Sequence, residues 1–383
     1  MTSEITTLGK LISLQRGYDL PETRRRPGTV PVVGSAGITG YHDTAKAKGP
    51  GVTVGRSGAS FGKITFIRED YWPHNAALFV TDFKDNEPLF IRYLLESLDF
   101  SSLNSGSAQQ SLNRNYVYGV SVRKYDLPVQ RRIAGILSAY DELIESNQRR
   151  IKILEEMARS LYREWFVHFR FPGHDKVKMV PSLLGPIPQG WEVTAIQQFG
   201  EVITGKTPSK ANPDFYGQDV PFVKTPDMHG NMFILETGDR LSMAGAESQA
   251  NKTIPAGSIC VSCIGTIGVV SLTTEDCQTN QQINSVILAR EEAREFLFIQ
   301  LQDLKQKLEN LGSTGATMGN VNKGKFESIE ILAPPDDLLE RYHRLVEPTF
   351  SVTLNLSRRI QNLRCTRDLL LPRLLSGQVL VTC

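Results

Sequence analysis

The sequence has little cysteine and no long apolar run. Only five of its 383 residues are Cys, an odd number that argues against a disulfide framework and fits a reducing compartment. No stretch approaches the roughly 18 apolar residues that a membrane span needs, and the N-terminal segment has neither a basic nor an apolar signal region. We therefore expect a cytoplasmic protein with free thiols and no membrane partner.

A strong excess of one charge is also missing. Lys and Arg total 43 and Asp and Glu total 41, so the formal net charge is only +2. This balance excludes a uniformly basic, coat-like nucleic-acid binder, and any polyanion would have to meet local patches. With 40% hydrophobic and 22% charged residues, the composition is typical of a folded globular protein, and the length allows two or three domains.

An internal repeat is the most informative feature that is present. Residues 30–33 (VPVV) resemble residues 220–223 (VPFV), and the apolar run 52–54 resembles 259–261. Residues 105–113 parallel 313–321 at an offset of 313 − 105 = 208, Pro128 pairs with Pro335 at 335 − 128 = 207, and residues 149–151 match 358–360 at 358 − 149 = 209. A period this long indicates two domain-sized copies rather than a solenoid.

Each copy begins with a part that we predict to be mixed α/β. Residues 1–126 and 190–333 are rich in Gly and β-branched residues in short alternating runs, which are typical of strands and loops. Within them, residues 89–98 and 291–311 place apolar residues at helical spacing. The sequence therefore predicts two globular α/β units.

Each copy ends with a predicted long helix, over residues 127–171 and 334–383. Ile133, Tyr140, Leu154 and Leu161 repeat at multiples of seven with further apolar residues four positions later, as in a coiled coil. A helix of ~35 residues would be ~50 Å long. We expect the two helices to pack together and Pro348 to kink the second one. Asn147 either fixes the register of the seam or faces solvent, and residues 172–189 are expected to form a surface linker.

Several motifs together resemble the DNA specificity subunit of type I restriction-modification enzymes. Residues 185–191 (GPIPQGW), 205–209 (GKTPS) and 220–223 occur in the order typical of that family, as do 127–133 (LPVQRRI) and 371–377 (LPRLLSG). The resemblance covers nearly all of the chain. It implies two target recognition domains, two long antiparallel coiled-coil helices that separate them, and an internal pseudo-two-fold repeat.

The same resemblance implies the partners. Double-stranded DNA with a split target would be read one half per domain, and two methylation subunits and restriction subunits would dock on the helices. S-adenosylmethionine, and ATP with Mg²⁺, would belong to those partner subunits, so this chain would have no cofactor, metal or catalytic residue of its own. The second helix start, residues 335–341, lacks the Gln-Arg pair of the first, which leaves equal docking of both partners open.

Loop Arg, Lys, Gln, Asn, Ser and Thr residues are the candidates for DNA contact, because their side chains can bind phosphates or groove edges. We expect the basic run near residue 25 to bind phosphate and the Gln and Asn residues to read bases. The candidates in the first unit are Arg16, Arg24, Arg25, Arg26, Arg56, Ser57, Gln109, Gln110, Asn113 and Arg114. Those in the second unit are Lys206, Thr207, Ser209, Lys210, Lys224, Thr225, Thr314, Thr317, Asn320 and Lys323.

Three other interpretations stay open from sequence alone. Residues 200–207 (GEVITGKT) match the phosphate-loop pattern, although turn-forming residues rather than a helix follow them. Residues 212–215 (NPDF) partly match an adenine methyltransferase motif. The near-zero net charge would also suit a protein-interaction adaptor with no DNA role. Cys260 and Cys263 lie in an apolar run without a second pair, so we expect buried thiols rather than a zinc site.

Overall fold

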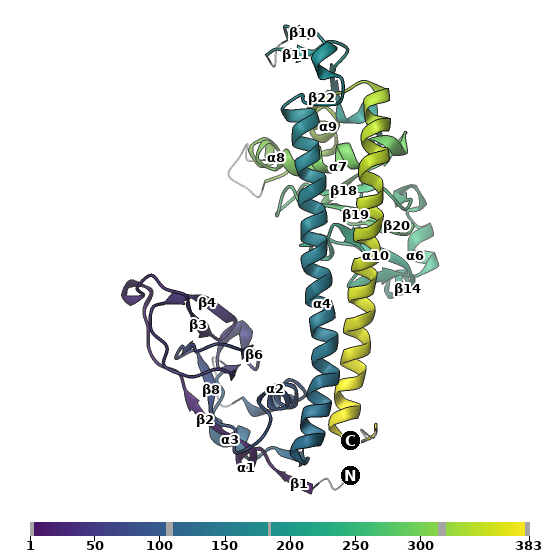
Figure 1. Cartoon of the computed structure of the whole chain (residues 1–383). Helices are drawn as coiled ribbons and strands as arrows, with labels where there is room; N and C mark the ends of the chain where they lie inside the picture. Colours follow the sequence, from purple (N-terminus) through teal and green to yellow (C-terminus); the bar gives the residue numbers. More distant parts are fainter. Residues whose placement is uncertain (1–3, 105–109, 183–184, 313–318, 380–383) are drawn as a thin grey trace. The chain divides into compact units, whose positions relative to one another are not determined.

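The protein folds into two compact units that share two long helices. The computed structural model describes residues 4–104, 110–182, 185–312 and 319–379. The first unit comprises Met1–Ser146 and Ile360–Cys383, and the second comprises Asn147–Arg359. Helices α4 (Leu127–Tyr162) and α10 (Asp336–Leu375) each contribute to both units (Figure 1).

In the first unit, a four-stranded sheet carries the core. Its strand order is β2-β8-β5-β6, and a smaller sheet has the order β4-β3-β7. The central strand β5 is buried along its whole length because helix α2 covers the sheet. The elements are β1 (Glu4–Thr7), α1 (Leu8–Leu11), β2 (Ser13–Arg16), β3 (Val30–Gly34), β4 (Gly37–His42), β5 (Gly51–Gly55), β6 (Ile64–Ile67), β7 (Trp72–Pro73), β8 (Ala77–Asp82), α2 (Pro88–Glu96), α3 (Arg114–Tyr118) and β9 (Ser121–Lys124).

The second unit has a larger version of the same arrangement. Its main sheet has the order β13-β21-β18-β19-β15, and the smaller one has the order β16-β14-β20-β17. The elements are β10 (Met179–Val180), β11 (Ile187–Pro188), β12 (Glu192–Ala195), β13 (Gly200–Thr204), β14 (Tyr216–Val223), α5 (Thr225–Met228), β15 (Phe233–Ile234), β16 (Asp239–Leu241), α6 (Met243–Glu247), β17 (Thr253–Ile254), β18 (Ile259–Ser262), β19 (Val270–Thr273), β20 (Cys277–Thr279), β21 (Ile283–Leu288), α7 (Arg294–Asp303), α8 (Lys305–Gly312), α9 (Lys323–Glu327) and β22 (Glu330–Ala333).

The predicted duplication is confirmed strand by strand. The run β2-β8-β5-β6 of the first unit reappears as β13-β21-β18-β19, and β3 pairs in parallel with β7 as β14 does with β20. The predicted matches 30–33 with 220–223 and 52–54 with 259–261 fall on these equivalent strands. One detail was wrong: Asn113 caps α3 and Asn322 caps α9, so at this point the offset is 322 − 113 = 209 rather than 208.

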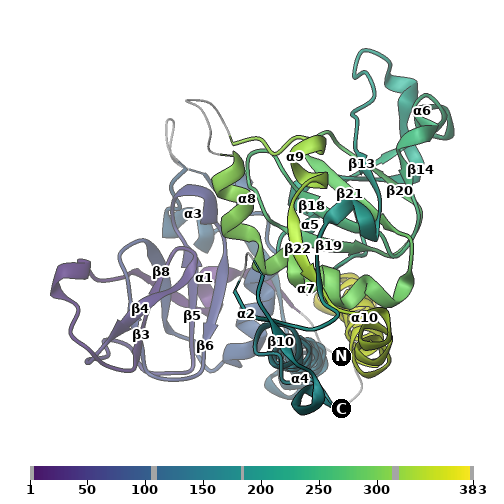
Figure 2. The ribbon, with the colours of Figure 1, turned by 90° about the horizontal axis from the view of Figure 1, so that it is seen from above.

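The two long helices pack antiparallel within each unit. In the first unit Arg367 of α10 binds Asp141 of α4, and in the second unit Tyr342 of α10 donates to the Ala158 carbonyl of α4. The mixed α/β fold with paired long helices is therefore as predicted. Figure 2 looks along these helices and shows α2 beside α4, and α7 beside α10.

The structure adds detail at three places in the long helices. Asn147 is buried, with only 2% of the residue exposed, so the solvent-facing alternative is wrong. Helix α10 continues through Pro348, although the proline removes one backbone hydrogen-bond donor. Val346 and Phe350 are buried on either side of it, and their packing holds the helix in place. Helix α4 ends at Tyr162, and a π-helical turn, Arg163–Val167, follows it.

The segment expected to be a surface linker is partly folded onto the second unit. Strands β10 and β11 form a short antiparallel ribbon, and Ile187 is buried in the same core as Phe171 and Trp191. The Phe171 and Trp191 rings lie 5.9 Å apart. Apolar residues within the Gly-Pro-rich stretch therefore anchor the chain where the second unit begins.

Two further observations concern the described residues only. No helix in the described part of the chain is long and apolar enough to cross a membrane. Over the same residues, no three His, Cys, Asp or Glu side chains are grouped so that they could hold a metal ion.

Candidate nucleic-acid interface

One edge of the main sheet in the first unit gathers polar side chains. Strands β2 and β5 both run antiparallel to β8, so their carboxyl ends and the start of β8 share an edge. Arg16 ends β2, Arg56 and Ser57 follow β5, and Asn75 precedes β8. A β-bridge between Ser57 and Ser111 brings the chain before α3 to the same place. We call this the first polar edge.

The second unit has the equivalent edge, which we call the second polar edge. Lys206 and Thr207 follow β13, and Gln281 and Gln282 precede β21. A β-bridge from Ile264 to Asn320 repeats the Ser57–Ser111 bridge of the first unit. The two edges therefore come from matching ends of matching strands.

Hydrogen bonds hold the long polar side chains at both edges. The Thr207 hydroxyl donates to Oε1 of Gln281 over 2.5 Å, and Nδ2 of Asn75 donates to Asp19. Asn75 and Gln281 are equivalent at an offset of 281 − 75 = 206. Because an amide both donates and accepts, Gln281 keeps donor capacity and Asn75 keeps acceptor capacity for a ligand.

The three arginines of the basic run are not alike. Arg24 is exposed on a short 3₁₀ helix, Glu22–Arg24. Arg25 donates from Nη1 to the Thr39 carbonyl at 2.8 Å. Arg26 forms two hydrogen bonds with Asp43, at 2.6 and 3.0 Å, and the bond from Arg26 is the main reason that the pKa of Asp43 falls to about 2. Two of the three guanidinium groups therefore already form hydrogen bonds within the first unit.

The remaining candidates of the first unit lie around the chain that leads into α3. Gln110 is exposed. Asn113 is exposed and caps α3 by accepting from the Asn115 amide at 3.0 Å. Arg114 is also exposed, and its Nη1 donates to the Leu14 carbonyl at 3.4 Å. Gln109 lies outside the described residues, as do Thr314 and Thr317 of the second unit.

In the second unit, most described candidates reach the surface. Lys206 and Lys210 are exposed, and Ser209 accepts from the Ala211 amide at 3.3 Å. Asn320 is exposed beside its bridge. Lys323 is exposed and pairs with Glu327 one turn along α9, at 3.3 Å. Exposed Lys206 gives the second polar edge a positive charge, whereas the charge of Lys323 is balanced by Glu327.

Thr225 is buried, and the partly exposed Lys224 is already engaged in an ion pair. Lys224 pairs with Asp239. Thr225 is only 6% exposed, and its hydroxyl has no hydrogen-bond partner among the described residues. The parallel pairing of β14 with β20 explains this placement, because the Asn280 amide donates to the Val223 carbonyl just before these two residues. We therefore leave both out of the proposed interface.

The phosphate-loop interpretation does not fit the backbone. Residues Gly200–Thr204 of the motif form β13 itself. The amides of Gly205 and Lys206 donate to the carbonyls of Ile283 and Thr279 at 3.1 and 2.9 Å. A phosphate loop needs these amides to face its ligand before a helix, whereas here they complete a sheet.

The other two minor motifs also have structural roles. Asn212 of the NPDF segment caps a 3₁₀ turn by accepting from the Asp214 amide at 3.2 Å. Cys260 and Cys263 are buried thiols as predicted, and burial raises the pKa of each to about 12. Thiols held in this state are poor metal ligands and nucleophiles.

Sequence reasoning missed Asn75, Gln281 and Gln282. No motif marks them, and each precedes a strand rather than lying in an obvious loop. The signal that could have found them is the repeat, because matching the strands after residues 76 and 282 would have aligned two amide-bearing segments. That alignment requires knowledge of where the strands begin and end, and the amino-acid composition does not give those positions.

Two copies of one α/β topology, each with a polar strand edge and each packed on paired long helices, define a duplicated recognition protein. The chain belongs to the type I restriction modification DNA specificity domain family, whose model matches residues 2–156 and 188–338. The resemblance drawn from the sequence motifs is confirmed by this match.

Known relatives agree with this assignment. The chain is 36% identical over 322 residues to the type I restriction enzyme HindI specificity subunit of Haemophilus influenzae, covering 69% of this chain and 70% of the relative. It is 25% identical to the MjaIX specificity subunit of Methanocaldococcus jannaschii, covering 76% and 69%. The crystal structure of a type I S subunit from M. genitalium has the same fold, with a TM-score of 0.66 at 14% identity and coverage of 98% and 96%.

Proposed function

We propose that this chain is the DNA specificity subunit of a type I restriction-modification complex and reads a bipartite target in double-stranded DNA. Each unit would read one half of the target through its polar edge. The single observation that carries this proposal is the duplication of the polar edge on equivalent strand ends within a family of DNA specificity domains. Two similar readers in one chain suit a target with two separate halves.

The side chains at the edges divide into two roles. Arg16, Arg24 and Arg56 in the first unit, and Lys206, Lys210 and Lys323 in the second, would bind phosphates and set the orientation of the duplex. Asn75, Gln110 and Gln281 would read base edges, because an amide can donate and accept at once and pairs well with adenine. The remaining proposed contacts are Ser57, Gln109, Asn113 and Arg114, and Thr207, Ser209, Thr314, Thr317 and Asn320.

The chemistry would lie in partner subunits. Two methylation subunits holding S-adenosylmethionine would dock along α4 and α10, and restriction subunits using ATP with Mg²⁺ would join them. This chain would then recognise DNA without catalysing a reaction and would need no cofactor of its own. Membership of the family, and the relatives that are themselves specificity subunits of type I restriction enzymes, support this division.

Methylome sequencing tests the proposed function. Cells with and without the chain should differ by one split methylation motif, and an unchanged methylome would contradict the proposal. Gln281→Ala should alter one half of that motif and Asn75→Ala the other half. Gln218→Ala, at an exposed position of β14 that belongs to neither polar edge, is the matched control and should leave the motif unchanged.

A further inference from the structure

In the first unit, a carboxylate fixes the direction of the Asn75 amide. Nδ2 of Asn75 donates to Oδ1 of Asp19. A carboxylate at neutral pH only accepts hydrogen bonds, so the amide nitrogen faces Asp19 and the amide oxygen is left for another partner. Within the described part of the chain, Oδ1 of Asn75 accepts no hydrogen bond, and the residue is partly exposed. The first polar edge therefore presents an acceptor at Asn75.

The equivalent pair in the second unit has the opposite sense. Asp19 and Thr207 each lie three residues after the end of the equivalent strands β2 and β13. Thr207 donates from its hydroxyl to Oε1 of Gln281, the counterpart of Asn75, at 2.5 Å. This bond occupies the amide oxygen and leaves the amide nitrogen of Gln281 for a ligand. Replacing a carboxylate by a hydroxyl at one position thus reverses which end of the neighbouring amide remains available.

The next amide along the chain has the same sense, and it does not depend on a hydroxyl group that can rotate. The Gln282 backbone N–H donates to Oδ1 of Asn280 at 3.1 Å, and a backbone N–H only donates. Nδ2 of Asn280 then donates to Oε1 of Gln282 at 3.0 Å. Nε2 of Gln282 donates to no acceptor among the described residues, and it lies beside Gly265, 3.7 Å from where a Cβ would be. The second polar edge therefore presents a donor at Gln282.

We infer that the two polar edges read groups of opposite hydrogen-bond polarity in the major groove, an inference that rests on the proposed function. Oδ1 of Asn75 accepts from the exocyclic amino group of adenine or cytosine in one half of the target. Nε2 of Gln282 donates its two hydrogens to O6 and N7 of guanine in the other half. Asp19 and Asn280 are positioning residues, because they touch no base but decide which end of the neighbouring amide does.

Duplexes that lack a single groove group test the first half, with the full chain bound to its methylation subunit. Replacing each adenine in turn by purine, or each cytosine by pyrimidin-2-one, deletes one amino group. At the position that Asn75 reads, wild-type affinity should fall about three- to tenfold, the effect of one lost hydrogen bond. Asp19→Asn keeps the side-chain shape but lets the Asn75 amide turn either way, so this loss should shrink to about twofold or less. Asp85→Asn removes the same charge from an exposed position beyond the other end of β8 and should keep the full loss.

The second half is tested with 7-deazaguanine, which lacks N7. Replacing the guanine that Gln282 reads should weaken wild-type binding about threefold or more. Gln282→Glu keeps the oxygen that accepts from Asn280 and puts a second oxygen in place of Nε2, so this variant should bind the normal and the modified duplex alike. Gln218→Glu adds the same charge outside the polar edges and should keep the wild-type difference between the two duplexes.

A merely structural role for Asp19 or Gln282 would change the affinity for all duplexes by one factor and leave the differences between them intact. That result in either variant would overturn the inference, as would a wild type that is indifferent to every deleted amino group or to every deleted N7. The proposed function would survive each of these results. If the wild-type complex preferred no DNA sequence at all, the proposed function itself would fail.

Discussion

The same helix junction is charged in the first unit and aromatic in the second. In the first unit, Asp141 accepts from the Tyr93 hydroxyl at 2.6 Å, from Arg367 at 2.5 Å and from Arg92 at 2.9 Å. These donors come from α2 and α10, so one carboxylate on α4 ties three helices together. In the second unit, Phe350 takes the place of Asp141 and packs against Phe298 and Phe233.

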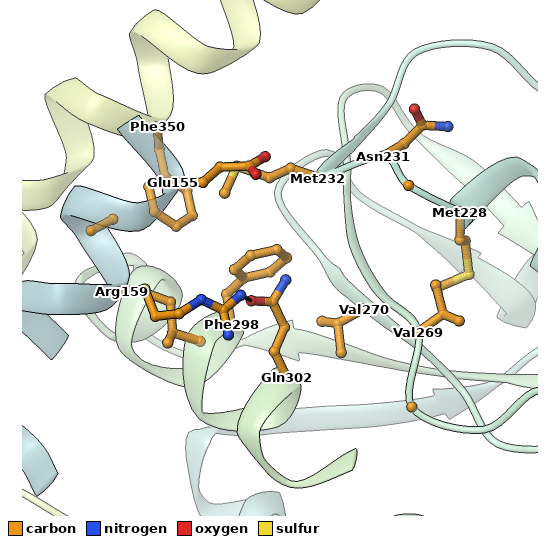
Figure 3. Close-up of a pocket in the computed structure, with 14 residues that line it drawn as sticks. Glu155, Arg159, Met228, Asn231, Met232, Val269, Val270, Phe298, Gln302 and Phe350 are labelled. Carbon is orange, nitrogen blue, oxygen red and sulfur yellow. Dashed lines mark hydrogen bonds between the residues drawn. The ribbon is translucent and has the colours of Figure 1, made fainter. Parts of the chain in front are cut away.

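Phe298 takes the place of Arg92, at an offset of 298 − 92 = 206. Glu155 of α4 lines the same hollow as Phe298 and Phe350, together with the guanidinium group of Arg159 (Figure 3). The second junction therefore has a carboxylate nearby, but at a different helix position from that of the first.

The difference shows that the two copies share which helix positions are buried, but not which kinds of side chain occupy the junction. The buried positions of α4 recur in α10, as Val129 with Leu338 and Ile133 with Tyr342, both at an offset of 209. The side chains between the long helices and the globular part can therefore differ, and they form an ion-pair network in the first unit and a cluster of aromatic rings in the second. A partly buried carboxylate is stable only while all its donors remain, whereas a ring cluster depends on filled volume.

Placing the carboxylate of the first junction in the aromatic junction of the second unit should produce the largest loss of stability. Phe350→Asp puts a carboxylate at a residue that is only 2% exposed and where Phe298 offers no donor. We expect the free energy of unfolding of the second unit to fall by about 3–5 kcal/mol, because an unpaired buried charge is added and ring packing is lost. Hydrogen exchange of α7 read by mass spectrometry would measure this, since it reports each unit separately.

The double variant Phe298→Arg with Phe350→Asp rebuilds the ion pair of the first unit. It should recover about 1–3 kcal/mol of the loss, because the two positions are in contact and their effects are not additive. A double variant that is no better than the sum of its single changes would show that the two junctions are not interchangeable.

Removing the central acceptor of the first unit should have the next largest effect. Asp141→Ala leaves Arg92, Arg367 and Tyr93 without their shared partner, and all of these side chains are less than a third exposed. We expect a loss of about 2–3 kcal/mol in the first unit. Faster hydrogen exchange in α2, with unchanged exchange in α7, is the expected pattern; equal changes in both would contradict a local role.

Lowering the pH should have opposite effects on the stability contributions of Asp141 in the first unit and Glu155 in the second. Burial opposes the charge of Asp141, but hydrogen bonds from Tyr93 and Arg367 and the nearby guanidinium charges outweigh it, so its pKa is lowered. The stability that this carboxylate contributes is present above its ordinary pKa of about 4 and is lost as the pH falls through the lower folded value. Burial raises the pKa of Glu155, so its protonation below that raised value favours the folded second unit.

These contributions can be isolated by measuring the free energy of unfolding as a function of pH for the wild type and for a variant without the charge, and by subtracting the second curve from the first. Subtracting the Asp141→Asn curve should leave a contribution that declines below about pH 4 and disappears below the lower folded pKa, and subtracting the Glu155→Gln curve should leave a penalty that disappears on acidification. Two contributions of the same sign would mean that one of the two local environments is misassigned.

The sequence predicted the fold well because burial leaves a periodic signal. The heptad positions such as Ile133, and the strand matches at residues 52 and 259, depend on apolar pattern alone and were found. The candidate site was predicted less completely. Thr225 was chosen by residue type although parallel pairing buries it, and Gln281 was missed because only the sheet places it beside Thr207. Non-local pairing decides which polar residues reach an edge, and a single sequence does not record it.

A neighbouring ion pair supplies the smallest effect and the sharpest control for burial. Arg68 and Glu142 lie 3.8 Å apart with their side chains 75% and 63% exposed, next to Asp141 in sequence. Because water screens exposed charges, Glu142→Ala should change the unfolding free energy of the first unit by about 0.5 kcal/mol or less. Asp141→Ala and Glu142→Ala remove the same functional group from consecutive residues, so equal losses in hydrogen-exchange protection of α2 would refute the claim that donor number and burial stabilise this junction.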